Sequence, residues 1–125
     1  MKTPYQNNRY SADIVRWIDG DTIELSVDLG QKVCVKGRYR LARIDAPETR
    51  LVKGVTKKEK KAGIALKEQL AKQFPTGTVV EIATHKAGKY GRYIVEVWVM
   101  DHEKEQRYNL STDLIEKGLA EEWEE

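Results

Sequence analysis

The sequence between Ser11 and Met100 consists mostly of short runs rich in Val, Ile and Tyr, which turn residues separate and one helical pattern interrupts. Residues 22–27 alternate apolar and polar side chains and follow Asp19-Gly20, which is a strong hairpin signal. Short alternating runs of this kind predict strands rather than helices. The expected strands are Asp13–Ile18, Thr22–Val27, Lys32–Lys36 continuing after Gly37 through Arg38–Ile44, Val79–Ala83 and Tyr93–Met100.

Two helices are expected in addition to these strands. Thr56 and Glu59 match a capping box, which predicts the start of a helix, and Pro75 ends it. After a polar turn at residues 101–107, a shorter helix is expected near Leu110, closed by Gly118. The buried face of the first helix is expected to be Ala62, Leu66, Leu70 and Phe74, and that of the second Leu110, Leu114 and Ile115.

This order of elements predicts an α+β, mainly β fold, namely a five-stranded Greek-key barrel of the OB type with two helices. An α+β sandwich with a split sheet is the alternative. With 125 residues, the chain is expected to form a single domain, residues 1–125, with a flexible N-terminus at residues 1–10.

Composition excludes several classes of protein. No apolar run approaches the roughly 20 residues that span a bilayer, so no membrane partner is expected. Residues 1–10 have no apolar signal segment, so the protein is expected to be cytoplasmic, or secreted if a precursor was trimmed. Cys34 is the only cysteine, which excludes an intramolecular disulfide. Its place between Val33 and Val35 predicts a packed thiol.

Charge is unevenly distributed along the chain. Residues 1–92 contain 19 Lys and Arg against 10 Asp and Glu, whereas residues 93–125 contain 3 against 10. A basic body with an acidic tail indicates a polyanionic partner on one face, although scattered solvated lysines would give the same count.

Two carboxylates and an arginine lie where strands end and turn. Hydrolysis of a phosphodiester needs cationic groups for the phosphoryl oxygens and a base or metal ion that activates water. Asp21 and Asp45, with a backbone carbonyl beside them, could hold a hard cation such as Ca²⁺. Glu48, three residues beyond Asp45, is the candidate general base. Arg40 could bind phosphate oxygens with two N–H groups at once.

The loop at residues 84–92 adds two candidates. Arg92 could bind phosphate in the same way as Arg40, and Tyr90 has a face on which a base could stack.

Each candidate also has a purely structural interpretation. Asp21 beside Gly20 suits a turn, and the arginines of residues 38–43 suit a solvated edge strand. Residues 45–49 could cap the next turn, and residues 89–92 could form an ordinary basic hairpin loop. The residues alone leave these interpretations open.

Arg40 and Asp45 are an odd number of residues apart, so strict alternation would place them on opposite faces of a strand. They can meet only if a bulge or a bend falls between them.

Four segments, taken in order, resemble the signatures of the staphylococcal nuclease (thermonuclease) family. They are Ile18-Asp19-Gly20-Asp21-Thr22, Arg40-Leu41-Ala42-Arg43-Ile44-Asp45-Ala46-Pro47-Glu48-Thr49, Lys89-Tyr90-Gly91-Arg92 and Gly118-Leu119-Ala120.

The resemblance implies an OB-fold, Ca²⁺-dependent endonuclease and exonuclease that acts on DNA and RNA and leaves 3′-phosphate ends. A single-stranded substrate and a monomer or weak dimer are expected. By position, the resemblance implies Ca²⁺ ligation by Asp21, Asp45 and the Ala46 carbonyl, Glu48 as general base, Arg40 and Arg92 as stabilisers of the transition state, and Lys89 with Tyr90 as nucleotide contacts.

The sequence departs from the best-known family member in two places. Ala46 replaces a threonine, and Glu125 ends the chain shortly after Ala120, where that member continues through tyrosines and a third helix. Weaker nucleotide affinity is therefore expected, unless Trp123 substitutes for those aromatic contacts. The alternative function is a non-catalytic OB-fold module that binds nucleic acid through Arg38, Arg43 and residues 57–61.

Overall fold

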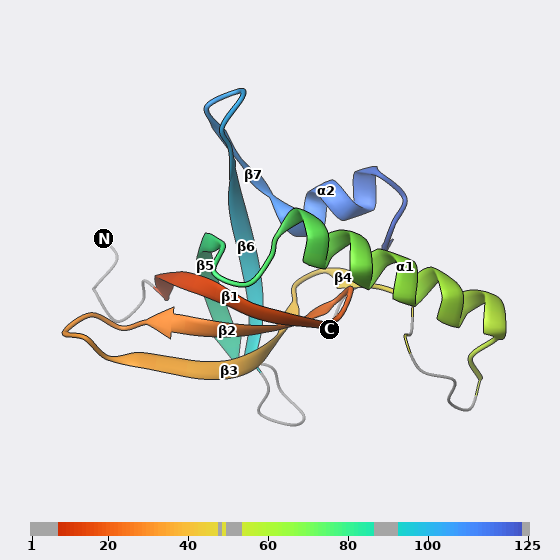
Figure 1. Ribbon diagram of the computed structural model, residues 1–125, viewed down its shortest axis with the longest axis horizontal. Coiled ribbons are helices and arrows are strands. Elements are labelled where there is room, and N and C mark those ends of the chain that lie inside the picture. Colours follow the sequence, from red (N-terminus) through yellow and green to blue (C-terminus); the bar gives the residue numbers. More distant parts are fainter. Residues whose placement is uncertain (1–7, 48, 50–53, 87–92, 124–125) are drawn as a thin grey trace.

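The computed structural model describes residues 8–47, 49, 54–86 and 93–123. Its strands are β1 (Arg9–Asp19), β2 (Thr22–Asp28), β3 (Cys34–Leu41), β4 (Ile44–Asp45), β5 (Val79–Lys86), β6 (Tyr93–Asp101), β7 (Gln106–Asn109) and β8 (Glu121–Glu122). Its helices are α1 (Lys57–Gln73) and α2 (Leu110–Glu116), as Figure 1 shows.

Five strands close into a barrel. Antiparallel pairings join β3 to β2, β2 to β1, β1 to β5 and β5 to β6, and a parallel pairing of β3 with β6 completes the ring. Apolar side chains from all five strands fill the interior, including Ile14, Ile23, Leu41, Ile82 and Val97. The closed barrel with two helices confirms the predicted α+β OB-type fold, and its closure excludes the open, split sheet.

The β2–β3 hairpin extends beyond the barrel, toward the left in Figure 1. Its turn is formed with positive φ angles at Gly30, Gln31 and Lys32. Cys34 is exposed, so the prediction of a packed thiol is wrong. The reason is that both faces of the strand are exposed at residues 34–36, where the hairpin has left the barrel.

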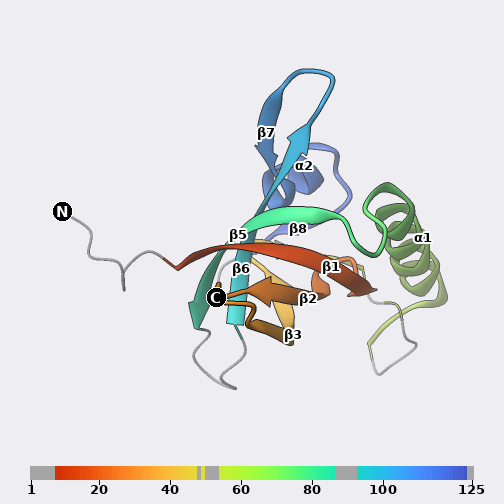
Figure 2. The ribbon, with the colours of Figure 1, turned by 60° about the vertical axis from the view of Figure 1, so that its left-hand side comes forward.

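Helix α1 lies beside the barrel, as the turned view in Figure 2 shows. Thr56 is its N-cap and accepts a hydrogen bond from the Glu59 backbone N–H at 3.1 Å, as the capping box predicts. At the other end, the Trp17 indole donates to the Phe74 carbonyl at 3.2 Å. Leu66, Leu70 and Phe74 are buried as predicted, but Ala62 is exposed and Gly63 is buried instead. The first turns of α1 therefore extend past the barrel wall.

Strand structure extends into two segments that were not predicted as strands. β1 begins at Arg9, within the N-terminus that was expected to be flexible, and residues 1–7 lie outside the described part. Residues 101–107, predicted as a turn, include the start of β7, which pairs with β6. After α2, Gly118 has a φ of +70° in the position predicted for it.

Two short strands add a second sheet that the sequence did not predict. β8 pairs antiparallel with β4, so the segment after α2 returns to the end of β3. Among the described residues, no helix is long and apolar enough to cross a membrane.

Candidate functional site

The turn between β1 and β2 places Asp21 in a buried position. Asp21 is 7% exposed, and its carbonyl accepts a hydrogen bond from the Leu41 N–H at 2.8 Å. Its Oδ2 accepts from the Ala46 N–H at 3.0 Å and from Arg40 Nη1 at 3.3 Å, while Oδ1 accepts from Thr22 Oγ1 at 3.2 Å. A carboxylate with this many donors is held in one orientation.

Gly20 allows this turn to approach its neighbours closely. A Cβ atom at Gly20 would lie 2.5 Å from Leu66 Cδ2 on α1 and 3.0 Å from the Ala46 Cβ. A side chain at this position would require Leu66 or the segment that carries Ala46 to shift. Asp19, on the other side of Gly20, accepts a hydrogen bond from Thr49 Oγ1, so the two carboxylates of the turn have separate partners.

A bend between β3 and β4 brings Arg40 and Asp45 to the same side. Arg43 has a φ of +65° in the turn at residues 42–43, which reverses the strict alternation of side chains. The Arg43 side chain holds the bend by donating to Glu96 at 3.2 Å and to Asn109 and Thr112 at 3.0 Å. The required bend is therefore present, and Arg43 is engaged within the protein.

The Arg40 guanidinium lies between two carboxylates. Its Nη1 is 3.3 Å from Asp21 Oδ2, and its Nη2 is 3.6 Å from Asp45 Oδ1 and donates to the Ile44 carbonyl at 3.0 Å. The Arg40 side chain is 13% exposed, whereas that of Asp45 is 57% exposed. The site thus has a buried, hydrogen-bonded side at Asp21 and an open side at Asp45.

Trp123 contacts the same guanidinium. The centre of its ring lies 4.7 Å from Arg40 Cζ, which is a cation–π contact. The β4–β8 pairing positions Trp123, and the backbone N–H of Trp123 donates to the Arg43 carbonyl at 2.9 Å. The sequence offered one signal for this contact, an aromatic residue within the acidic segment 121–125.

Asp45 and Ala46 also line a pocket of about 260 Å³. Its other walls are Pro47, Glu59 on α1 and residues 118–121. The carboxylate on the open side of the site therefore faces a space that a small ligand could enter.

The structure brings four of the predicted site residues together: Asp21, Arg40, Asp45 and Ala46. The other four, Glu48, Lys89, Tyr90 and Arg92, lie outside the described residues. Within the described ranges, no three His, Cys, Asp or Glu side chains form a group that could hold a metal ion. The oxygens that lie around Arg40 are those of the Asp21 and Asp45 carboxylates and of the Ile44 carbonyl, and oxygen atoms are the ligands that hard cations prefer.

Tyr39 precedes Arg40 and points into the barrel. Burial raises the pKa of the Tyr39 phenol, and the neighbouring Tyr93 and Tyr10 phenols raise it further. Burial, followed by Asp113 and Asp101, likewise raises the pKa of Tyr108. Both phenols are therefore neutral at physiological pH and do not act as bases.

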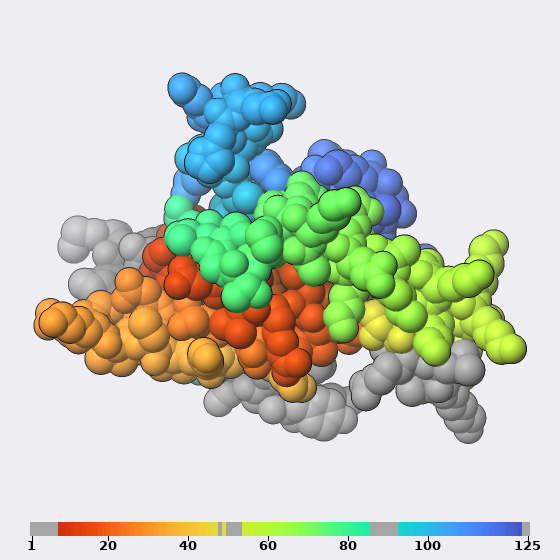
Figure 3. Space-filling view, in the orientation of Figure 1, coloured from red at the N-terminus to blue at the C-terminus, as the bar shows by residue number. Residues whose placement is uncertain are grey.

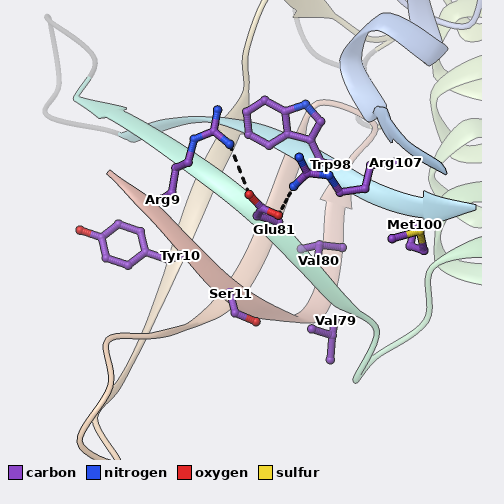
Figure 4. Close-up of a pocket in the computed structure, with 9 residues that line it drawn as sticks. All are labelled: Arg9, Tyr10, Ser11, Val79, Val80, Glu81, Trp98, Met100 and Arg107. Carbon is purple, nitrogen blue, oxygen red and sulfur yellow. Dashed lines mark hydrogen bonds and ion pairs between the residues drawn. The ribbon is translucent and has the colours of Figure 1, made fainter. Parts of the chain in front are cut away.

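A separate pocket of about 430 Å³ lies on the outer face of β1, β5, β6 and β7 (Figure 4). Arg9 lies over the Trp98 ring at 4.9 Å, and Arg9 and Arg107 both pair with Glu81. Glu81 is the one carboxylate among the residues that line this pocket, and it already pairs with both arginines. The Arg40 site is the better candidate for metal-dependent phosphate chemistry, because two carboxylates, Asp21 and Asp45, lie beside its arginine.

Two comparisons with known proteins found relatives of this chain. Residues 38–125 match the sequence model of a family described as Staphylococcal nuclease homologue. Over 111 residues, the chain is 32% identical to a protein of Escherichia coli named Protein ParB, and the alignment covers 86% of this chain. The chain spans about half of that relative, 54% of its length.

Proposed function

Because the chain belongs to the staphylococcal nuclease family, we propose that it is a Ca²⁺-dependent nuclease that cleaves DNA and RNA and leaves 3′-phosphate ends. The observation that carries this proposal is the meeting of Asp21, Arg40 and Asp45 at one place. Carboxylates for a hard cation and a guanidinium for phosphoryl oxygens are the groups that phosphodiester hydrolysis needs. The proposed substrate is single-stranded or locally open nucleic acid.

Asp21, Asp45 and the Ala46 carbonyl would hold the cation. When bound, Ca²⁺ would supply positive charge for the phosphoryl oxygens and make a water molecule more acidic. Asp21 is the rigid ligand of the set, because Ala46, Thr22 and Arg40 fix its oxygens. Asp45, being exposed, is the ligand that can adjust.

Arg40 would donate N–H groups to the phosphate as negative charge develops on its oxygens. Glu48 would accept the proton of the attacking water. Arg92 would be the second cationic donor, and Lys89 with Tyr90 would contact the nucleotide. The roles of these last four residues rest on the family resemblance alone.

The proposed function is tested by cleavage of an end-labelled single-stranded DNA with Ca²⁺, with Mg²⁺ and with chelator. We expect cleavage with Ca²⁺ only, products that a 3′-phosphatase shifts on a gel, and a loss of about 100-fold in Glu48→Ser. The matched control is Glu103→Ser, an exposed carboxylate in the β6–β7 hairpin, which should leave the rate unchanged.

Binding of the DNA without cleavage in any metal would reject the nuclease. It would instead assign the chain to the alternative function, a non-catalytic OB-fold module that binds nucleic acid.

Replacing Trp123 tests whether it positions Arg40. We expect Trp123→Ala to lower kcat about fivefold, on the scale of one cation–π contact, and Trp123→Phe to retain most of the activity. The Arg40 Nε–H resonance should shift in Trp123→Ala, because the ring current of the indole is lost. A raised KM with unchanged kcat would mean that Trp123 contacts substrate rather than positioning Arg40.

A further inference from the structure

We infer that an exposed basic surface along α1 is a second nucleic-acid-binding surface, which holds the phosphate backbone of the strand that is cleaved at Arg40. The α1 basic surface consists of Lys57, Lys58, Lys60, Lys61 and Lys67 on α1 and Arg38 on β3. The inference rests on the proposed function for where the scissile phosphate lies. Binding to the surface itself does not require cleavage.

The surface is hollowed and continuous. Lys57, Lys58, Lys60 and Lys61 line one hollow of about 640 Å³. Arg38 and Lys67 line a second of about 430 Å³, together with the carboxylates Asp19 and Glu68, so the excess of positive charge lies in the first hollow. Ile64 belongs to both, so the hollows meet at that residue. Figure 3 shows the first turns of α1, in yellow-green, projecting from the right-hand side of the molecule. The first hollow lies on this projecting part of the helix, and the second lies between the helix and barrel strands β1 and β3.

The surface adjoins the candidate site at two points. Arg38 and Arg40 are two residues apart on β3, opposite Glu24 and Thr22 of β2, so they share one face of the strand. Glu59, between the lysines of the first turn, lines the small pocket together with Asp45. A strand bound at Arg40 can thus continue onto the α1 basic surface.

The cations of this surface differ from the other basic residues in how they are paired. Five of the six arginines in the described part form ion pairs, and Arg38 is the one that does not. Lys57, Lys58, Lys60, Lys61 and Lys67 likewise form no ion pair among the described residues. Residues 57–68 contain five lysines against two glutamates, so their charge is not neutralised locally.

The lysines also stand where a helix alone disfavours them. The first turn of a helix carries partial positive charge and is stabilised by acidic residues, and like charges three or four residues apart repel. Lys57, Lys60 and Lys61 have this spacing at the start of α1. Such a conflict between sequence and local structure is expected at functional positions, and a bound polyanion relieves both parts of it.

The chemistry of the surface indicates which polyanion it binds. Lysine is a compact point charge that holds phosphates without reading bases, so the bound group is a sequence-independent phosphate backbone. From Lys57 to Lys67 the helix rises about 15 Å. At about 3.4 Å per nucleotide along one strand, this length spans roughly four nucleotides beyond the site.

The test compares binding of fluorescent oligothymidylates of about 4 and about 16 nucleotides in chelator, where no cleavage occurs, over a range of salt concentrations. For the quadruple variant Lys57→Gln, Lys58→Gln, Lys60→Gln, Lys61→Gln, we expect the slope of log K against log salt for the longer oligonucleotide to become shallower by about 2 to 3. The Kd of the longer oligonucleotide should rise about tenfold or more at low salt, whereas that of the shorter one should be nearly unchanged.

The matched control removes four lysines elsewhere, as Lys32→Gln, Lys36→Gln, Lys72→Gln, Lys104→Gln. It has the same net charge as the first variant, and it should keep the wild-type slope. Equal weakening in both variants would overturn the inference, because net charge alone would then explain binding. Weaker binding in the first variant alone, without Ca²⁺-dependent cleavage by the wild type, would support the α1 basic surface and reject the nuclease. Ca²⁺-dependent cleavage without that difference in binding would support the nuclease and reject the surface.

Discussion

Replacing Arg40 with lysine is expected to lower kcat by about 10²- to 10³-fold, on the scale of a lost oxyanion donor. Arg40 uses Nη1 for Asp21 and Nη2 for the Ile44 carbonyl, so its planar group is held in one orientation. Lysine keeps the charge, but its single nitrogen cannot retain both contacts and present two parallel N–H groups to a phosphate. The loss corresponds to about 3 to 4 kcal/mol of transition-state stabilisation. Single-turnover cleavage of labelled DNA at saturating Ca²⁺ measures it.

Arg16→Lys is the matched control, because Arg16 is an exposed arginine of β1 that pairs with Glu24 rather than with Asp21 or Asp45. It should leave kcat unchanged, since Arg16 belongs neither to the candidate site nor to the α1 basic surface. Both variants are to be checked by chemical denaturation. The free energy of unfolding of Arg40→Lys is expected to fall by about 1 to 3 kcal/mol, because lysine cannot satisfy all the hydrogen-bond partners of Arg40. If the kcat values of the two variants were equal, Arg40 would have no special role in the reaction.

Much of the barrel could be predicted because its strands obey a period of two and its turns contain glycine. The strand at residues 22–28 and the helix after Thr56 fall close to the predicted limits. Cys34 was wrongly predicted to be buried, because a strand-like sequence does not show whether the paired strands cover the core. Ala62 was misplaced because a period of four drifts away from the 3.6-residue turn, so that Gly63 faces the barrel instead.

The candidate site shows a different limit. The sequence required a bend between Arg40 and Asp45 but did not locate it, since Arg43 is not a residue type that favours a positive φ. What stabilises that bend is remote in sequence, because Arg43 binds Glu96, Asn109 and Thr112. Long-range partners of this kind leave no local pattern.

The contact of Trp123 with Arg40 could not be predicted from the sequence for the same reason. It lies on Arg40 because β8 pairs with β4, and each of these strands has only two residues, too few to show alternation. The family resemblance suggested a nucleotide contact for Trp123, whereas the structure places it against a catalytic candidate of the protein itself. The acidic segment that carries Trp123 thereby becomes part of the site.

Asp21→Asn is expected to lower Ca²⁺-dependent activity about a thousandfold at limiting Ca²⁺, because a hard cation needs the carboxylate charge. The fold is expected to survive. The asparagine oxygen can take the place of Oδ2 and accept from Ala46 and Arg40, and its amide can face Thr22 Oγ1, which is able to accept. Only the charge is lost, at a stability cost of about 1 kcal/mol. Ca²⁺ affinity should fall far more, because a hard cation depends on carboxylate charge.

The matched control is Asp19→Asn, on the other side of Gly20, whose carboxylate binds Thr49 rather than the Arg40 cluster. Calorimetric titration with Ca²⁺ and the rise in Tm that bound Ca²⁺ produces both report metal binding without relying on activity. Wild type and Asp19→Asn should show the same titration and the same rise, and Asp21→Asn should show neither. If Asp19→Asn were the variant that lost Ca²⁺, the ligand would lie on the opposite side of the turn, and Arg40 would then be held by Asp21 for structural reasons alone.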